Sequence, residues 1–224
     1  MRLISRLFLC AGLGSAVLLT SCETTSSVAS SSSGPYRVTA KRPNNPANVR
    51  VKVSLQRQNI YVMEGDRLLM AVATTVGTPE KPTPKGTFKI YRKEEFKRSN
   101  SYGFRVQGDR VIPAKSSDKI SGRYVGYPMG YWVEFKPAYG FHQGYVHTRP
   151  RSHGCLRLKG EAAAKFFALV RSGTPVNIAD TQPEDATIGP KIQRVDDARL
   201  PDIPNNVVIT QAAFTKPSGP LLED

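Results

Sequence analysis

The sequence predicts a mainly β domain with one docked α-helix. Apolar and polar residues alternate with a period of two over residues 49–56, as they do in a strand with one buried face. Residues 60–76 are typical of a β-hairpin, because two apolar runs flank a turn at residues 64–66. One later segment, residues 161–172, carries apolar side chains at helical spacing. Together these patterns indicate the β-rich class.

The prolines of segment 77–86 fix φ and remove backbone donors, so this segment is predicted to be a stiff loop. Residues 93–128 are polar, basic and rich in Gly and Ser, and are interpreted as a long connection, functional or partly disordered. Further strands are predicted over residues 87–91, 131–135 and 174–178.

The predicted helix places Glu161 in its first turn and Gly173 at its C-terminal stop position. An apolar face that packs onto the sheet is expected from these positions. The residues of this face are Ala163, Phe166, Phe167 and Val170.

The N-terminus predicts export. Residues 1–21 combine a basic start, a short apolar run and small residues, which is typical of a signal peptide and too short to span a bilayer. Leu19-Thr20-Ser21-Cys22 resembles a bacterial lipobox, so Cys22 is expected to be lipidated after cleavage before it. The alternative is an ordinary secretory signal with a chance cysteine at the cut. With the lipid, the protein is expected to be membrane-anchored in the cell envelope and to face the periplasm or cell wall, at the outer membrane in a bacterium with two membranes.

The rest of the chain divides into three parts. Residues 22–48 are rich in Ser, Pro and Asn and are predicted to form a flexible tether. Residues 49–179 have the length of one ordinary domain. Residues 180–224 are Pro-rich and are predicted to be a largely irregular tail.

A formal net charge of +14 favours binding to polyanions but does not identify which one. No basic helix or nucleic-acid motif is present in the sequence, so no nucleic-acid partner is expected. Carboxylate-rich wall peptides and anionic lipid headgroups are the polyanions of the expected compartment. A generally basic, solvated surface explains the charge equally well, so we base no function on it.

Cys155 is expected to be a reactive thiol. The chain has three cysteines, of which Cys10 leaves with the signal peptide and Cys22 carries lipid, so Cys155 has no disulfide partner. All three histidines, His142, His147 and His153, lie within residues 142–155. The alternative is a buried core cysteine, which is common in general.

A thiol nucleophile needs a base and donors aimed at an oxyanion. Gly154 removes a side chain beside Cys155, so that backbone amides can approach a substrate carbonyl. In an extended segment Arg157 projects on the same face as Cys155, where its charge can stabilise a thiolate or bind a carboxylate. His153 and His142 both remain candidates for the base on these grounds alone.

The motif Ser152-His153-Gly154-Cys155-Leu156-Arg157-Leu158, with His142-Gln143-Gly144 upstream, resembles the signature of the L,D-transpeptidase catalytic domain, the YkuD-type fold. The likeness extends over residues 49–178. Three further segments resemble family motifs: Pro82-Thr83-Pro84-Lys85-Gly86-Thr87-Phe88, Pro128-Met129-Gly130-Tyr131-Trp132 and Gly173-Thr174-Pro175-Val176.

The resemblance implies a β-sandwich-like fold and a role for each site residue. Cys155 is the nucleophile, His142 the base, and the backbone carbonyl of Gln143 orients that base. His153, Gly154, Ser152 and Arg157 support the oxyanion and shape the site, while Tyr131 and His147 are assigned to substrate binding. The implied partners are peptidoglycan stem peptides, with envelope proteins as further amine acceptors. No cofactor and no metal are implied.

Three other readings compete with this one. Three histidines and a cysteine could bind zinc, although His153 and Cys155 at positions i and i+2 are an awkward pair for one tetrahedral ion. A papain-like peptidase places its cysteine before its histidine, and no histidine follows Cys155. A cell-wall carboxypeptidase or endopeptidase, or a wall-binding lipoprotein without catalysis, could use the same fold.

The lipobox predicts that Cys22→Ser moves the protein out of the membrane fraction. Its turnover of soluble muropeptides should not change, because Cys155 lies in a separate folded domain. Membrane fractionation followed by an activity assay measures both effects. Unchanged fractionation of the variant would contradict lipidation at Cys22.

Overall fold

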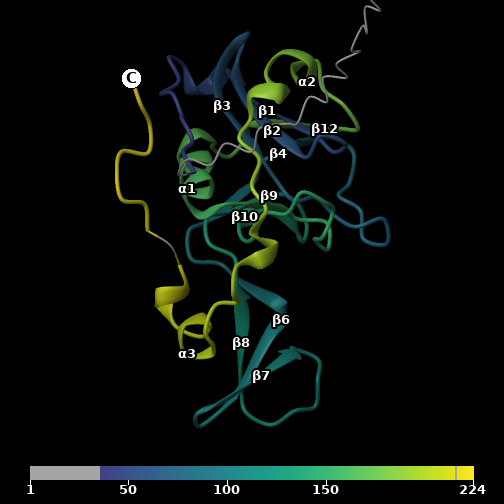
Figure 1. Cartoon of the computed structure of the whole chain (residues 1–224), viewed down its shortest axis with the longest axis vertical. Coiled ribbons are helices and arrows are strands. Elements are labelled where there is room, and N and C mark those ends of the chain that lie inside the picture. The colour runs from purple at the N-terminus through teal and green to yellow at the C-terminus, as the bar shows by residue number, and fades with distance from the viewer. Residues whose placement is uncertain (1–35, 215) are drawn as a thin grey trace, which may run out of the picture. The chain divides into compact units, whose positions relative to one another are not determined.

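The computed structural model describes residues 36–214 and 216–224, and these residues form a mainly β fold (Figure 1). Their strands lie in a five-stranded sheet β3-β2-β1-β12-β4, a four-stranded sheet β11-β10-β9-β5 and a three-stranded sheet β7-β6-β8. The strands are β1 (Val49–Ser54), β2 (Asn59–Glu64), β3 (Arg67–Ala73), β4 (Gly86–Lys89), β5 (Arg92–Glu94), β6 (Arg98–Gln107), β7 (Arg110–Lys115), β8 (Arg123–Pro128), β9 (Trp132–Lys136), β10 (Tyr139–Gln143), β11 (Leu156–Leu158) and β12 (Pro175–Ala179).

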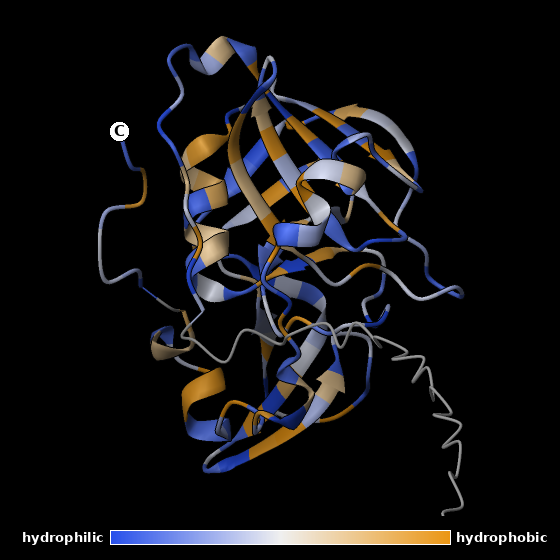
Figure 2. Ribbon diagram, turned by 45° about the horizontal axis from the view of Figure 1, so that its top comes forward, coloured by the Kyte–Doolittle hydropathy of each residue, from blue (hydrophilic) through white to orange (hydrophobic). Residues whose placement is uncertain are grey.

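The five-stranded sheet confirms the strands predicted from the alternation of residues. β2 and β3 pair antiparallel across a turn in which Gly65 has a φ of 59°, a conformation that favours glycine. β12 lies between β1, with which it pairs parallel, and β4, with which it pairs antiparallel. Buried and exposed residues alternate along β12 and the first part of β1, while β2 is buried on both faces (Figure 2).

An aromatic chain joins the sheets to helix α1 (Gly160–Leu169). The Phe141 ring of β10 lies 4.6 Å from Phe166 of α1 and 5.4 Å from Phe135 of β9, measured between ring centroids. Phe135 in turn lies 5.2 Å from Phe88. The predicted docking of one helix on a β-rich core is therefore confirmed.

Helix α1 ends earlier than residue 172, the predicted end. Val170 is extended, with φ −107° and ψ 154°, and residues 171–174 form a turn closed by the bond from the Thr174 N–H to the Arg171 carbonyl. Lys93 Nζ donates to the carbonyls of Phe167 and Val170 at 2.6 Å each. A cation at the last carbonyls is a favourable C-terminal cap, which explains the early end.

The interpretation of residues 93–128 as a connection is wrong, because they contain all three strands of an antiparallel sheet, β7-β6-β8. Many residues of β6 and β7 are partly exposed, so no strong alternation marks them in the sequence. The glycines that suggested a loop are required by close packing. A Cβ on Gly126 would lie 2.0 Å from the Ser99 carbonyl oxygen, and one on Gly103 would lie 2.3 Å from that of Val125.

The described part of the predicted tether is packed onto the domain. Val38 and Ala40 are buried in the main core, and Lys165 Nζ donates to the Val38 carbonyl. The prediction of a flexible tether therefore does not hold for residues 36–48, which include the 3-10 helix η1 (Pro46–Asn48). Two apolar side chains in this stretch reach the core despite the polar composition around them.

The tail after β12 contains short helical turns and irregular segments. It runs from α2 past β10 to α3, which lies beside the three-stranded sheet (Figure 1). Asp185 accepts hydrogen bonds from the side chains of Ser54 and Tyr61, and Arg98 of β6 donates to the carbonyls of Val208 and Thr210. The turns are α2 (Glu184–Thr187), η2 (Gly189–Lys191), η3 (Asp197–Arg199), α3 (Asn205–Val208) and η4 (Gln211–Ala213).

The signal peptide over residues 1–21, Cys22 and the first part of the predicted tether lie outside the described residues. Among the helices that the structure describes, none has the length and apolar character needed to cross a membrane.

Candidate active site

Two short parallel strands carry the candidate site. β10 pairs with β11 in a register that sets Phe141 opposite Leu156, His142 opposite Arg157 and Gln143 opposite Leu158. Residues that pair across parallel strands project on the same face, so His142 and Arg157 share one face of this sheet. Cys155 directly precedes β11, two residues before Arg157, so that an extended chain turns its side chain toward that face as well.

The opposite face anchors the pair in the core. Phe141, Leu156 and Leu158 are fully buried there. The alternation of residues along β10 and β11 thus separates an apolar face from a reactive face. This separation places the reactive residues of the motif on one face and the residues that anchor them in the core on the other.

His142 is buried, and its Nδ1 lies 2.7 Å from the carbonyl oxygen of Gln143. A carbonyl can only accept, so Nδ1 carries the proton and Nε2 keeps its lone pair. The Trp132 ring lies 6.0 Å from the imidazole, measured between centroids. Burial, with a smaller effect from the Arg157 charge, lowers the pKa of His142 to about 4, against the opposing effect of the Gln143 carbonyl. The imidazole is therefore neutral at neutral pH and has the form of a base.

The Cys155 thiol is held between backbone groups of the turn before β10 and of the first residues of β10. Its Sγ lies 3.7 Å from the Ala138 carbonyl oxygen, which accepts from the thiol, and it also interacts with the backbone N–H of Gly140. Burial raises the pKa of Cys155, while the Gly140 N–H and the Arg157 charge oppose this effect without reversing it. Both the thiol and the imidazole are therefore neutral at rest, and the proton has to move as the sulfur attacks.

Sequence reasoning did not identify the residues that hold this turn. Glu134 accepts hydrogen bonds from the Ala138 backbone N–H at 3.1 Å and from the Trp132 ring N–H at 3.3 Å. Ala138 itself has a φ of 67°, which is strained for a residue other than glycine. Strain of this kind persists only where the surroundings enforce it, and here it directs the Ala138 carbonyl at the thiol. No motif in the sequence marks Glu134 for this role.

Ser152 shapes the loop before the thiol. It is 1% exposed, and its hydroxyl donates to the Cys155 carbonyl at 2.6 Å and accepts from the Gly154 N–H at 3.0 Å. Because that N–H is used within the loop, Gly154 contributes shape to the site. Its φ of 103° and the 2.5 Å between a Cβ at this position and the Tyr139 ring leave space for glycine only.

Backbone contacts around the start of the proline-containing loop (residues 77–86) support the segment of Ser152 and Gly154. The Ser152 N–H donates to the Val76 carbonyl at 3.0 Å, and the Thr78 N–H donates to the Ser152 carbonyl at 3.1 Å. A Cβ on Gly77 would lie 2.9 Å from the Cα of Gly154, so the two backbones touch.

His153 is exposed, unlike His142. Its ring lies 4.9 Å from that of Tyr102, measured between centroids, and Tyr102 belongs to β6. Lys81 Nζ lies 3.4 Å from the Tyr102 hydroxyl. Burial, then the charges of Lys81, Arg157 and Lys115, lower the pKa of His153. The three-stranded sheet thus reaches the catalytic loop, a contact that the polar sequence of β6 does not indicate.

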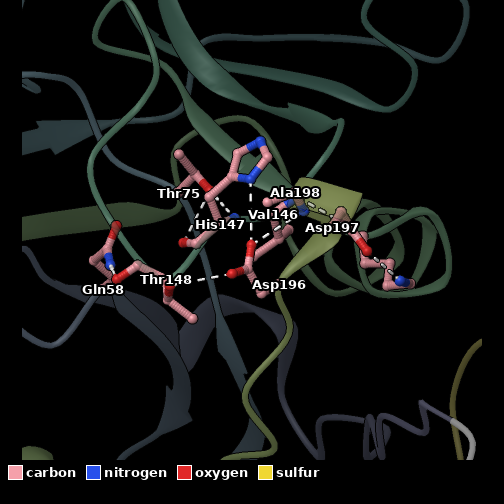
Figure 3. Close-up of polar contacts among 9 residues, drawn as sticks. Gln58, Thr75, Val146, His147, Thr148, Asp196, Asp197 and Ala198 are labelled. Carbon is pink, nitrogen blue, oxygen red and sulfur yellow. Dashed lines mark hydrogen bonds and ion pairs between the residues drawn. The ribbon is translucent and has the colours of Figure 1, made fainter. Parts of the chain in front are cut away.

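Two residues assigned to substrate binding lie elsewhere. Tyr131 is 6% exposed, and its ring packs edge-on against Phe167 of α1 at 5.8 Å, so it belongs to the core. His147 is 8% exposed, its backbone N–H donates to Thr75 Oγ1 at 2.6 Å, and its Nδ1 lies 3.5 Å from Asp196 (Figure 3). These surroundings do not support a substrate contact for either residue. Their positions in the sequence suggested one because each lies near a motif residue.

The histidines do not converge on one point. His142 binds the Gln143 carbonyl, His147 faces Asp196 and His153 stacks on Tyr102. Across residues 36–214 and 216–224, no group of three or more His, Cys, Asp or Glu side chains is arranged to hold a metal ion. The geometry therefore gives the zinc reading no support.

The raised pKa of Cys155 predicts slow alkylation at neutral pH. The rate constant with iodoacetamide should rise with pH and reach half its maximum above about pH 8.5, the ordinary value for a thiol. Mass spectrometry of the intact protein over a pH series measures this rate. A plateau of fast alkylation below that pH would instead reveal a preformed thiolate and imidazolium pair.

Comparison with known proteins agrees with this geometry. The profile of the YkuD family, the L,D-transpeptidase catalytic domain, matches residues 48–178. L,D-transpeptidase 1 of Mycobacterium tuberculosis is 30% identical over 129 residues, which are 56% of this chain and 48% of the relative. The chain thus spans about half the length of the curated relatives that it matches.

Solved structures with partial likeness include two L,D-transpeptidases. The protein from Mycobacterium smegmatis has a TM-score of 0.47 at 22% identity, covering 59% of this chain and 58% of its own. That from Xylanimonas cellulosilytica has a TM-score of 0.46 at 21% identity, covering 64% of this chain and 65% of its own. The family profile covers more than half of the sequence and includes both strands of the site. The chain therefore belongs to the YkuD family of L,D-transpeptidase catalytic domains.

Proposed function

We propose that the protein is an L,D-transpeptidase that acts on the stem peptides of peptidoglycan through a cysteine thioester. The observation that carries this proposal is the buried, neutral His142, which keeps its Nε2 lone pair and shares a sheet face with Cys155. Family membership supports the same chemistry.

The proposed acylation begins at the bond between the L-centre of the diamino acid at stem position three and the D-residue at position four. The Cys155 sulfur attacks the carbonyl carbon, and its proton passes to His142 Nε2. The backbone N–H of Cys155, with support from His153, faces the oxyanion. The C–N bond then breaks, His142 returns the proton to the leaving amine, and the acyl group remains on the sulfur as a thioester.

An amine resolves the thioester in the second half of the reaction. It attacks the same carbonyl carbon and gives its proton to His142; the C–S bond then breaks, and the leaving thiolate takes that proton back from His142. A stem-peptide amine gives a 3-3 crosslink and a protein lysine gives a wall anchor. Water in place of the amine gives a carboxypeptidase or endopeptidase, which is the second candidate function.

We further propose that Cys22 anchors the protein to a membrane so that the domain faces the cell wall. The lipobox-like sequence before Cys22 supports this proposal. Between Cys22 and the packed segment that begins at Tyr36 lies a short Ser-rich stretch.

Incubation of the purified protein with wall sacculi tests the function directly. Mass spectrometry of the muropeptides should detect 3-3 linked dimers and the released D-residue of stem position four, both absent with Cys155→Ala. Shortened stems without dimers would support the hydrolase instead. Binding without any change in the muropeptides would contradict both enzymatic functions.

His142→Ala is expected to slow acylation by a carbapenem about a hundredfold or more, because loss of a general base has effects of this size. Acylation is followed as one mass adduct on the intact protein. Cys155→Ala should form no adduct, and an adduct on that variant would contradict its role as nucleophile.

His147→Ala is the matched control for this experiment. It removes a buried imidazole from the segment that follows β10, but this imidazole faces Asp196 and not the thiol. Its acylation rate should fall far less than that of His142→Ala. Equal losses in both histidine variants would argue against His142 as the base.

A further inference from the structure

Asp197 joins the two catalytic strands from outside the family domain. It lies in η3 of the tail, beyond residue 178 where the family match ends, and is 4% exposed. One carboxylate oxygen accepts from the Val146 N–H at 2.9 Å, and the other accepts from Lys159 Nζ at 2.6 Å. The Asp197 N–H also donates to the Val146 carbonyl at 2.8 Å.

The two partners of Asp197 each lie shortly after one of the two catalytic strands. Val146 follows β10, the strand of His142, and Lys159 follows β11, the strand that begins after Cys155. Beyond the bond from the Gly144 N–H to the Leu158 carbonyl at 2.9 Å, the strands separate. Asp197 therefore connects the segments that follow β10 and β11, directly after these two strands separate.

Neighbouring contacts hold Asp197 in this position. Asp196 accepts from the Ala198 N–H at 3.1 Å, which caps η3, and its carboxylate faces His147 and Thr148 (Figure 3). Tyr145 also donates its hydroxyl to the Pro201 carbonyl at 2.5 Å. The tail thus grips residues 145–148, the beginning of the loop that leads to Ser152 and Cys155.

β11 contains only three residues, so few ladder bonds fix its position against β10. Any shift between these strands changes the distance from the thiol to the imidazole. We infer that Asp197 is a positioning residue for the proposed acyl transfer, which sets the register of Cys155 against His142 through Val146 and Lys159. This inference rests on the proposed function and adds a residue to it that no motif contains.

The test compares acylation by a carbapenem with alkylation by iodoacetamide at alkaline pH, where hydroxide can take the thiol proton in place of His142. Asp197→Ala should slow acylation about tenfold or more, because a misplacement of about 1 Å can cost about a hundredfold in rate. Its alkylation rate should stay unchanged. Asp197→Asn keeps an acceptor for the Val146 N–H but loses the charge that pairs with Lys159. Its acylation rate should lie between that of Asp197→Ala and that of the unaltered protein.

Asp185→Ala is the matched control, since it removes another carboxylate that anchors the tail, but at Ser54 of β1 and Tyr61 of β2 and not at residues that follow the catalytic strands. It should lower the melting temperature and leave the ratio of the acylation rate to the alkylation rate unchanged. Equal ratios in the Asp185 and Asp197 variants would overturn the inference.

If Asp197→Ala does not fold, Lys159→Met decides, because it removes one of the two partners and keeps the aliphatic stem. A lowered ratio supports the inference and an unchanged ratio overturns it. Failure of the proposed function would give a different result: the unaltered protein would form no adduct with the carbapenem.

Discussion

The parallel pairing of β10 with β11 is the constraint on which the rest of the site depends. It is short, and the burial of Phe141, Leu156 and Leu158 on the core side decides which residues of the two strands face the site. A slip of one residue would turn His142 or Cys155 into that core, because side chains alternate between the two faces of a strand. The packing of Phe141 on Phe166 of α1 therefore acts on the chemistry, although neither ring touches the thiol.

Burial has two opposite consequences at this site. It fixes the His142 ring against Trp132 and the Gln143 carbonyl, and it also removes the charged forms of both His142 and Cys155. The Arg157 charge opposes the effect of burial on the thiol and adds to it on the imidazole. The resting site thus avoids a buried ion pair and separates charge only while a substrate is attacked. A neutral thiol is also a poorer target for oxidants than a thiolate.

Sequence patterns predicted the elements with one buried face and failed where both faces are partly exposed. The strand from Val49 and the docked helix were found because their apolar residues repeat with the period of the structure. β6 was not found, since its burial pattern contains no clear alternation, and its contact through Tyr102 with His153 was missed with it. The motif pointed to Cys155 and left the base open until the resemblance favoured His142. Asp197 carries no local signal, because its partners lie more than thirty residues away and only the folded tail brings them together.

A short backbone pairing joins residues 40–42 to Glu223, and so joins the two flanks of the described domain. The Arg42 N–H donates to the Glu223 carbonyl at 2.7 Å, and the Glu223 N–H donates to the Ala40 carbonyl at 2.8 Å. This pairing ties the two flanks of the described domain to each other and shares no hydrogen bond with the ladders of β1, β10 or β11. Fraying that starts at the C-terminal flank therefore opens this pairing before it reaches the strands that carry the thiol and the imidazole.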